Sequence, residues 1–131
     1  MRVAKATTEA PAPRGHYSQA IVTEGRLLYT SGQEPIDPGT GRPVGGSMYR
    51  QTQRALENLR AVVEAAGGRL SNAVKVTAYI DDLAAFKEYD RAFAEFFEGD
   101  PPARTTIRCD LPGFAVEIDA IVALEPGSSS G

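Results

Sequence analysis

Apolar residues recur along the chain at two spacings, one typical of helices and one typical of strands. After Ser47 they return every three or four positions, at Leu56, Leu59, Val62, Val63 and Ala66. This spacing predicts an amphipathic helix that Ser47 can cap and that ends at Gly67-Gly68. A second helix is predicted after Asp81 or Asp82, with a stripe formed by Leu83, Phe86, Asp90, Phe93 and Phe97.

Strict alternation of apolar and polar residues predicts a half-buried strand over 73–80. Its two faces hold Val74, Val76, Ala78 and Ile80 on one side and Lys75, Thr77 and Tyr79 on the other. Two shorter apolar runs, 20–22 and 27–29, flank Glu24-Gly25 and are predicted to pair as a hairpin. The Pro- and Gly-rich segment 34–46 is expected to be a loop with tight turns.

Residues 101–120 are predicted to form two strands around a turn at Pro112-Gly113. In a hairpin whose loop has an even length, Arg104 and Thr106 share one face with Glu117 and Asp119. The opposite face is then apolar and contains Ile107, Cys109, Val116, Ile118 and Ala120. We therefore expect a guanidinium and a carboxylate together on one polar face.

The order of these elements predicts an α+β domain with two helices packed on one face of a mixed sheet. A single domain is expected over 1–124, followed by a disordered polar tail, 125–131. The other face of the sheet is too polar for a core but suits contact with a second subunit. A homo-oligomer with sites at its interfaces is therefore expected.

Composition narrows the classes of function. The 131 residues carry a net charge of −3, and the basic residues are scattered, so nucleic acid is not an expected partner. No apolar run is long enough to span a membrane, and the start lacks a signal-peptide core, so a cytoplasmic location is expected. With one Cys and one His, neither a disulfide nor a zinc site is expected.

Two charged residues are the main candidates for chemistry. Arg104 presents a fork of donors that matches a carboxylate, and Glu117 can act as a general base if it is partly removed from water. A surface ion pair of Arg104 with Glu117 or Asp119 explains the same residues, as does a pair between Arg108 and Glu117, so a structural role stays open.

Three other residues have alternative interpretations. Cys109 is expected to be a small core residue rather than a nucleophile. His16 is expected to be solvated rather than catalytic. Asp90 lies on an aromatic stripe, where an unpaired charge is costly, so it faces an exposed edge, pairs with a cation or helps to form a polar pocket.

Four segments, in the same order, resemble the RidA/YjgF family of enamine/imine deaminases. They are GHYSQAIVTEGRLLYTSGQEPIDPGTG, QTQRALENLRAVVEAAGG, VKVTAYIDDLAAFKEYDRAFAEFF and PPARTTIRCDLPGFAVEIDA. The resemblance implies a chorismate-mutase-like α+β fold and a homotrimer. In that trimer three sheets form an inner barrel, the helices lie outside, and a cleft separates each pair of neighbouring subunits.

The resemblance also implies roles for particular residues. Arg104 would bind the substrate carboxylate, Glu117 would activate a water molecule, and Thr106 would offer backbone groups to the substrate. The adjoining subunit would contribute substrate-binding residues, namely Tyr17, Ser31, Gly32, Phe86 and Asp90. Two positions depart from the family pattern, since His16 replaces a proline and Asp90 replaces a frequent asparagine.

The implied activity is hydrolysis of reactive 2-imino or 2-enamino acids, such as 2-iminobutanoate and 2-iminopropanoate, to 2-keto acids and ammonia. Such a hydrolase of C–N bonds needs no cofactor or metal, because an imine carbon is already electrophilic. The alternative is a non-catalytic trimer that binds a small carboxylate for regulation, which would follow if Arg108 neutralised Glu117. RNA cleavage, proposed for some family members, is disfavoured by the acidic composition.

Overall fold

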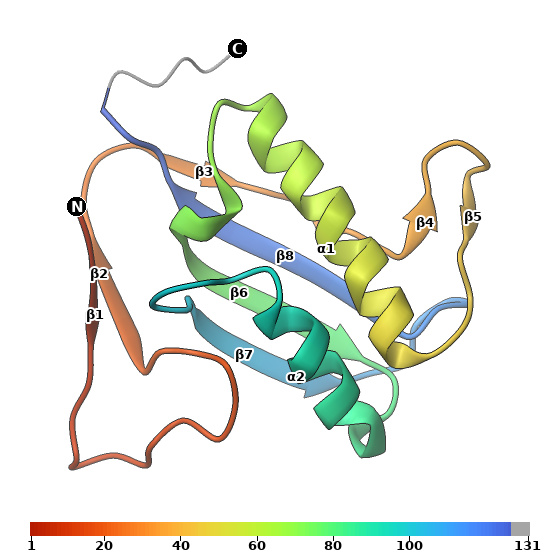
Figure 1. The fold of residues 1–131 in the computed structure, drawn as a ribbon, viewed down its shortest axis with the longest axis horizontal. Coiled ribbons are helices and arrows are strands. Elements are labelled where there is room, and N and C mark those ends of the chain that lie inside the picture. The colour runs from red at the N-terminus through yellow and green to blue at the C-terminus, as the bar shows by residue number, and fades with distance from the viewer. Residues whose placement is uncertain (127–131) are drawn as a thin grey trace.

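The computed structural model describes residues 1–126 and contains a four-stranded sheet with two helices on one face (Figure 1). The strand order is β3 (Leu27–Tyr29), β8 (Val116–Ala123), β6 (Ala73–Ile80) and β7 (Ala103–Arg108). β6 runs antiparallel to β8 and parallel to β7, so the sheet is mixed and the expected α+β class is confirmed. The predicted tail lies mostly outside the described residues. Its disorder and the domain limit at 124 stay predictions.

Both predicted helices form, although the second, α2 (Phe86–Ala94), is shorter than its predicted stripe, since Leu83 and Phe97 lie outside it and Leu83 is 54% exposed. α1 (Met48–Ala65) begins at Ser47, whose hydroxyl oxygen accepts a hydrogen bond from the Arg50 amide at 3.1 Å. Gly67, at φ 84°, follows its end in the left-handed conformation that glycine adopts without strain. A 3-10 turn, η2 (Leu83–Ala85), capped by Asp82, leads into α2.

The core lies between these helices and the sheet. Val76, Ala78 and Ile80 of β6 are fully buried, as the alternation predicts, and a side chain of the size of Val76 or Ile80 contributes about 1.5–3 kcal/mol when it leaves water. A β-bulge between Ala73 and Lys75 shifts the register there. Ala73, rather than the predicted Val74, therefore belongs to the core.

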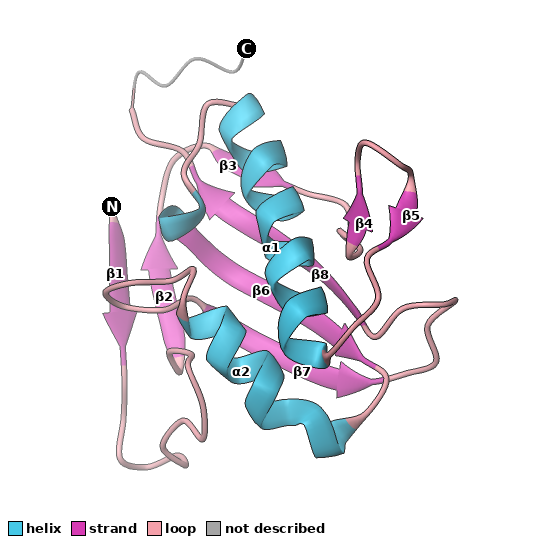
Figure 2. Ribbon diagram, turned by 45° about the vertical axis from the view of Figure 1, so that its right-hand side comes forward, coloured by secondary structure: helices cyan, strands magenta, loops and turns pink. Residues whose placement is uncertain are grey.

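The predicted hairpin of 20–22 with 27–29 is wrong, although both strands exist. β2 (Ala20–Thr23) pairs instead with β1 (Arg2–Lys5), whereas β3 pairs with β8. Figure 2 shows β1 and β2 as a separate ribbon at one side of the main sheet. The segment 34–46 contains a second small ribbon, β4 (Ile36–Asp37) with β5 (Arg42–Pro43), and a 3-10 turn, η1 (Leu70–Asn72), precedes β6.

The predicted hairpin of residues 101–120 is also wrong, because β6 lies between β7 and β8. The connection 109–115 passes around the end of β6. At its start the Cys109 amide donates to the Ile80 carbonyl at 3.0 Å, and at its end the Ala115 carbonyl accepts from the Asp81 amide at 3.0 Å. β7 and β8 therefore each pair with β6, and they do not pair with each other.

The second face of the main sheet carries no helix (Figure 1). β6 presents Lys75, Thr77 and Tyr79 on it, as predicted, and β8 presents Glu117 and Asp119. Large apolar side chains are also exposed there: Tyr29 is 68% exposed, Ile107 46% and Leu27 36%. This open face is both too polar for a core and too apolar for a typical solvated surface.

Candidate active site

Arg104 lies on the helix-covered face of the sheet, not on the open face. Its register partner in β6 is the buried Val76, and its side chain is only 1% exposed. Its guanidinium carbon is surrounded by four aromatic rings, at 4.6–5.6 Å from the ring centres, namely those of Tyr17, Phe86, Tyr89 and Phe93. Such contacts attract a cation electrostatically and compensate in part for its removal from water.

Asp90 of α2 is the ionic partner of Arg104. Nη2 of Arg104 is 2.9 Å from Oδ1 of Asp90, whose side chain is 23% exposed. Of the three alternatives for Asp90, pairing with a cation is therefore the one that the structure supports. Within residues 1–126, however, neither Nη1 nor Nη2 of Arg104 has an acceptor in hydrogen-bond geometry. The guanidinium is thus charge-neutralised but retains donor capacity.

The loop before β2 closes over this ion pair. The His16 amide donates to Oδ1 of Asp90 at 2.9 Å, and His16 Nε2 lies 2.6 Å from the Phe97 carbonyl, so His16 is not the solvated residue expected. A Cβ on Gly15 would lie 2.9 Å from both Arg104 Nη2 and Asp90 Oδ1. Glycine therefore permits the close approach of this loop to the pair.

Tyr89 and Thr106 complete the surroundings of the guanidinium. The Tyr89 hydroxyl and Thr106 Oγ1 are 2.7 Å apart and share a hydrogen bond. Burial raises the pKa of Tyr89 to about 12, although the positive charge of Arg104 opposes the shift. Tyr89 is therefore a neutral hydrogen-bonding group at physiological pH.

Glu117 lies on the open face, in register with Tyr79 of β6. The backbone of Gly32 packs against its carboxylate, since a Cβ on Gly32 would lie 2.2 Å from Glu117 Oε2. An antiparallel bridge between Gln33 and Ile118 sets Glu34 opposite Glu117 on the same face. Gly32 and Glu34 also line a hollow of about 490 Å³ beside α1.

The pKa of Glu117 is raised, first by its partial removal from water and then by the negative charges of Glu34 and Asp119. Partial burial also raises the pKa of Asp119. Glu117 is therefore a stronger base than an ordinary surface carboxylate, as its proposed role requires.

The structure divides the predicted site residues into two groups. Tyr17, Phe86, Asp90 and Thr106 gather around Arg104 on the helix-covered face, whereas Gly32 adjoins Glu117 on the open face and Ser31 directly precedes Gly32 in the chain. The expectation that Arg104 and Glu117 share a face is wrong, because it assumed a direct hairpin. The division between subunits that the resemblance implied is also wrong for three residues, because Tyr17, Phe86 and Asp90 contact Arg104 of their own chain.

The topology also contradicts two predicted structural roles, namely an ion pair between Arg108 and Glu117 and a place for Cys109 in the core. Arg108 cannot lie directly opposite Glu117, because β6 separates their strands, and the described ion pairs do not include this one. Cys109 is half-buried, and its neighbour Ile107 shares the open face with Glu117 rather than the core.

The sequence alone did not indicate four residues of the candidate site. Gly15, Tyr89 and Phe93 lie around the Arg104 guanidinium, and Glu34 lies opposite Glu117. Tyr89 and Phe93 follow Phe86 at helical spacing, so this spacing was a usable signal for a group of aromatic rings. Glu34 becomes recognisable only once its strand partner is known. Gly15 becomes recognisable only once the fold places its loop over Arg104.

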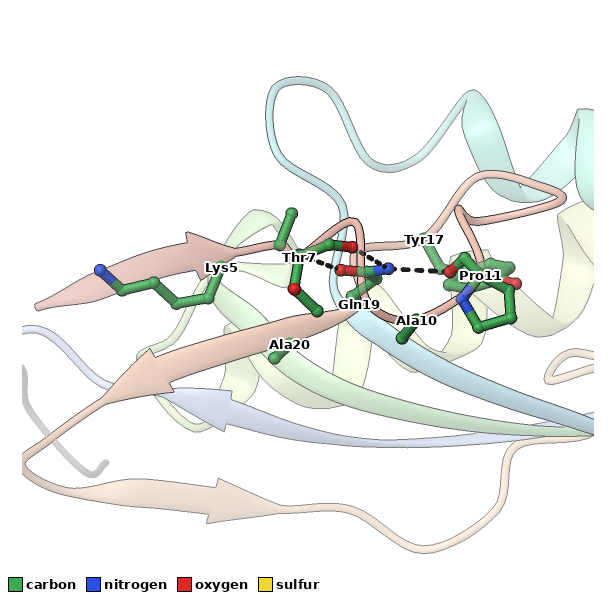
Figure 3. A pocket seen from close by; sticks show the side chains of 8 residues that line it. Lys5, Thr7, Ala10, Pro11, Tyr17, Gln19 and Ala20 are labelled. Atoms are coloured by element: carbon green, nitrogen blue, oxygen red, sulfur yellow. Dashed lines mark hydrogen bonds between the residues drawn. The ribbon is translucent and has the colours of Figure 1, made fainter.

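A hollow of about 510 Å³ adjoins the Arg104 group on the side of Tyr17 (Figure 3). Gln19 holds its wall together, since its side chain accepts from the Thr7 amide at 2.6 Å and donates to the Pro11 carbonyl at 2.8 Å. Tyr17 therefore forms part of both the hollow and the aromatic surroundings of Arg104.

The described residues contain no group of three or more His, Cys, Asp or Glu side chains arranged to hold a metal ion. Within residues 1–126, no helix has the length and apolar character needed to cross a membrane.

Comparison with known proteins assigns the family. A family model described as Endoribonuclease L-PSP matches residues 7–124. A RutC family protein of Pyrococcus horikoshii is 43% identical over 121 residues, which are 91% of this chain and 95% of that protein. The structure of RidA from an Antarctic Psychrobacter shares 37% identity with a TM-score of 0.73 and covers 91% of this chain and 97% of its own. The chain belongs to the RidA/YjgF family.

Names within the RidA/YjgF family point to different chemistries. A Rattus norvegicus member, 36% identical over 127 residues, is named 2-iminobutanoate/2-iminopropanoate deaminase and covers 95% of this chain and 92% of its own. The description of the family model instead names an endoribonuclease. Membership of the RidA/YjgF family therefore fixes the fold, while the choice of reaction depends on the site.

Proposed function

We propose that this protein is a deaminase that hydrolyses small 2-imino acids and their 2-enamino tautomers to 2-keto acids and ammonia. The observation that carries the proposal is the buried guanidinium of Arg104, whose Nη1 and Nη2 have no acceptor in hydrogen-bond geometry within residues 1–126 although Asp90 lies beside Nη2. Two such donors match the two oxygens of a carboxylate. The name of the Rattus norvegicus relative supports the same class of substrate.

The proposed reaction needs one anchor and one base. Arg104 binds the carboxylate and holds C2 of the imine near a water molecule. The water oxygen bonds to C2 while Glu117 takes one of its protons, and Glu117 passes this proton to the imine nitrogen to give a tetrahedral carbinolamine with one hydroxyl and one amino group on C2. Glu117 then moves the hydroxyl proton to the amino nitrogen as the C–N bond breaks, so that ammonia leaves and the C2 oxygen becomes the carbonyl of the 2-keto acid. Glu117 ends as the carboxylate it began as, so no cofactor is consumed.

Two copies of the chain are required for such a site. Arg104 and Glu117 lie on opposite faces of one sheet, so the arginine of one subunit must meet the glutamate of another. We propose a cytoplasmic homotrimer in which the open faces point inward and each cleft joins two subunits. The exposed Tyr29, Ile107 and Leu27 favour this arrangement, because apolar side chains gain stability when a partner covers them.

In such a trimer each cleft combines the two groups described above. One subunit supplies Arg104 with Tyr17, Phe86, Asp90 and Thr106. Its neighbour supplies Glu117 with Ser31 and Gly32. This revised division replaces the one that the resemblance implied.

The carboxylate-binding regulator considered above loses its main support, because Arg108 does not pair with Glu117. RNA cleavage has no support from charge, since the chain is acidic overall. A nuclease signal that disappears on repurification would be a contaminant.

Imine hydrolysis tests the proposal directly. 2-Iminobutanoate and 2-iminopropanoate are generated in situ by oxidation of the amino acids, and the rate of imine loss is followed. Arg104→Ala and Glu117→Ala should each lower kcat/KM by at least about tenfold, since the first removes the anchor and the second the base.

Arg69→Ala and Glu125→Ala are matched controls, because these residues form an exposed ion pair away from the site. Both should retain the wild-type rate. Wild-type rates in both site variants would refute the assignment. Binding of 2-oxobutanoate by calorimetry without any imine hydrolysis would favour the regulator.

A further inference from the structure

The Arg104 that is proposed to bind substrate already has a carboxylate partner within its own chain. Oδ1 of Asp90 lies 2.9 Å from Nη2, as close as a substrate oxygen would be. The Arg104–Asp90 pair carries no net charge. An anionic ligand therefore approaches a cation whose charge is already balanced.

Asp90 is held in this position by the fold. Its Oδ1 also accepts the His16 amide at 2.9 Å, and the loop at Gly15 approaches both members of the pair. These contacts come from a segment far away in the sequence, since His16 and Asp90 are 74 positions apart. The carboxylate is therefore a fixed part of the surroundings of Arg104.

The surroundings of the pair strengthen its electrostatic effect. Four aromatic rings surround Arg104 and the Asp90 side chain is only 23% exposed, so the charge of Asp90 is screened less than that of a fully exposed carboxylate. A ligand carboxylate bound to Arg104 would lie a few ångströms from Asp90 and would be repelled by it. An uncharged ligand of the same shape would not be repelled.

We infer that Asp90 is a specificity-determining residue, whose carboxylate competes with a ligand carboxylate for Arg104. It weakens the binding of 2-imino acids relative to uncharged imines of similar shape. This inference rests on the proposed function for the choice of ligand. The inference concerns the relative affinity for two ligands, whereas the proposed function concerns turnover. An experiment can therefore refute one of them without refuting the other.

The test compares wild type with Asp90→Asn by calorimetry, using 2-oxobutanoate and its uncharged isostere 2-oxobutanamide. Asparagine keeps an oxygen for the His16 amide but removes the charge. The Kd of 2-oxobutanoate should fall about tenfold, because a repelling charge a few ångströms away is lost. The Kd of 2-oxobutanamide should stay the same. Circular dichroism checks that the variant is folded.

Glu98→Gln is the matched control, since it removes one negative charge from an exposed side chain after α2. It should change neither Kd. In turnover, Asp90→Asn should lower KM for 2-iminobutanoate without lowering kcat. Equal effects on both ligands, no effect on 2-oxobutanoate, or no binding of it to either protein would overturn the inference. Absence of imine hydrolysis in wild type, with the calorimetric shift intact, would instead refute only the proposed function.

Discussion

Glu117 combines several influences that keep its carboxyl group protonated to a higher pH than usual. Its pKa is raised above the ordinary 4.5 by partial burial, by Glu34 and by Asp119, while Tyr79 faces it from β6. A neighbouring subunit that covered the open face would remove more water and raise the pKa further. The base would then be active only above this raised pKa.

The pH profile of kcat/KM should therefore rise through the raised pKa of Glu117. Glu34→Gln removes a like charge opposite Glu117, which lowers the pKa, so the acidic limb of the profile should move to lower pH. Glu57→Gln, on the exposed side of α1, should leave the limb in place. A limb that stays in place in Glu34→Gln, or moves to higher pH, would show that Glu34 does not act on the base.

The same residue has a consequence for stability. Because the folded protein binds the Glu117 proton more strongly than the unfolded chain does, this group lowers the free energy of unfolding as pH rises from 4.5 through the raised pKa. The charged base is thus kept at a cost in stability at neutral pH, which is common at functional sites.

Among the elements, the segment that follows β3 positions Glu117. The Thr30 amide donates to the Ala120 carbonyl at 3.0 Å, and Gln33 exchanges two hydrogen bonds with Ile118, so this segment continues the sheet edge. Gly32 lies between these contacts, with its backbone against the Glu117 carboxylate.

Gly32→Ala should lower activity while leaving the stability of the fold nearly unchanged. Its Cβ would displace the Glu117 carboxylate, the movable end of a side chain, so the melting temperature should change little. A displaced base should lower kcat/KM by about a hundredfold, since small misplacements of this kind have large effects. Gly39→Ala, in the exposed turn between β4 and β5, is the control. Activity equal to wild type would mean that Gly32 does not set the position of the base.

At the scale of secondary structure, the sequence predicts which segments form helices and strands but not which strands pair. Both helices and β6 were predicted because their apolar spacing is local, and Ser47 and Gly67 mark the limits of α1. Strand partners were not predicted, because alternation assigns residues to two faces without saying which strand lies beside which. The assumed hairpin therefore placed Arg104 on the wrong side of the sheet.

The burial of Arg104 was not predictable from its own strand either. Charged side chains usually stay in water, and alternation alone treats an arginine as a polar-face residue. What compensates here is a set of groups from α2 and the N-terminal loop, including Asp90 and Tyr17. The resemblance named these two residues, but only the fold shows that they contact Arg104 of the same chain.

For the whole molecule, one sheet separates Arg104, the proposed substrate anchor, from Glu117, the proposed base. No change of side-chain conformation within one chain joins Arg104 and Glu117 on the same face, so the account requires an oligomer. In a cyclic trimer each cleft would combine Arg104 of one subunit with Glu117 of the next.

Mixed trimers test this requirement most directly. Arg104→Ala and Glu117→Ala, each inactive alone, are unfolded together, refolded in equal amounts and assayed for 2-iminobutanoate hydrolysis. If each cleft joins two subunits, about one quarter of the clefts in randomly mixed trimers contain both intact residues, and a matching share of wild-type activity should return. If the mixture stays as inactive as the separate variants, both residues belong to one subunit's site, and the account is wrong.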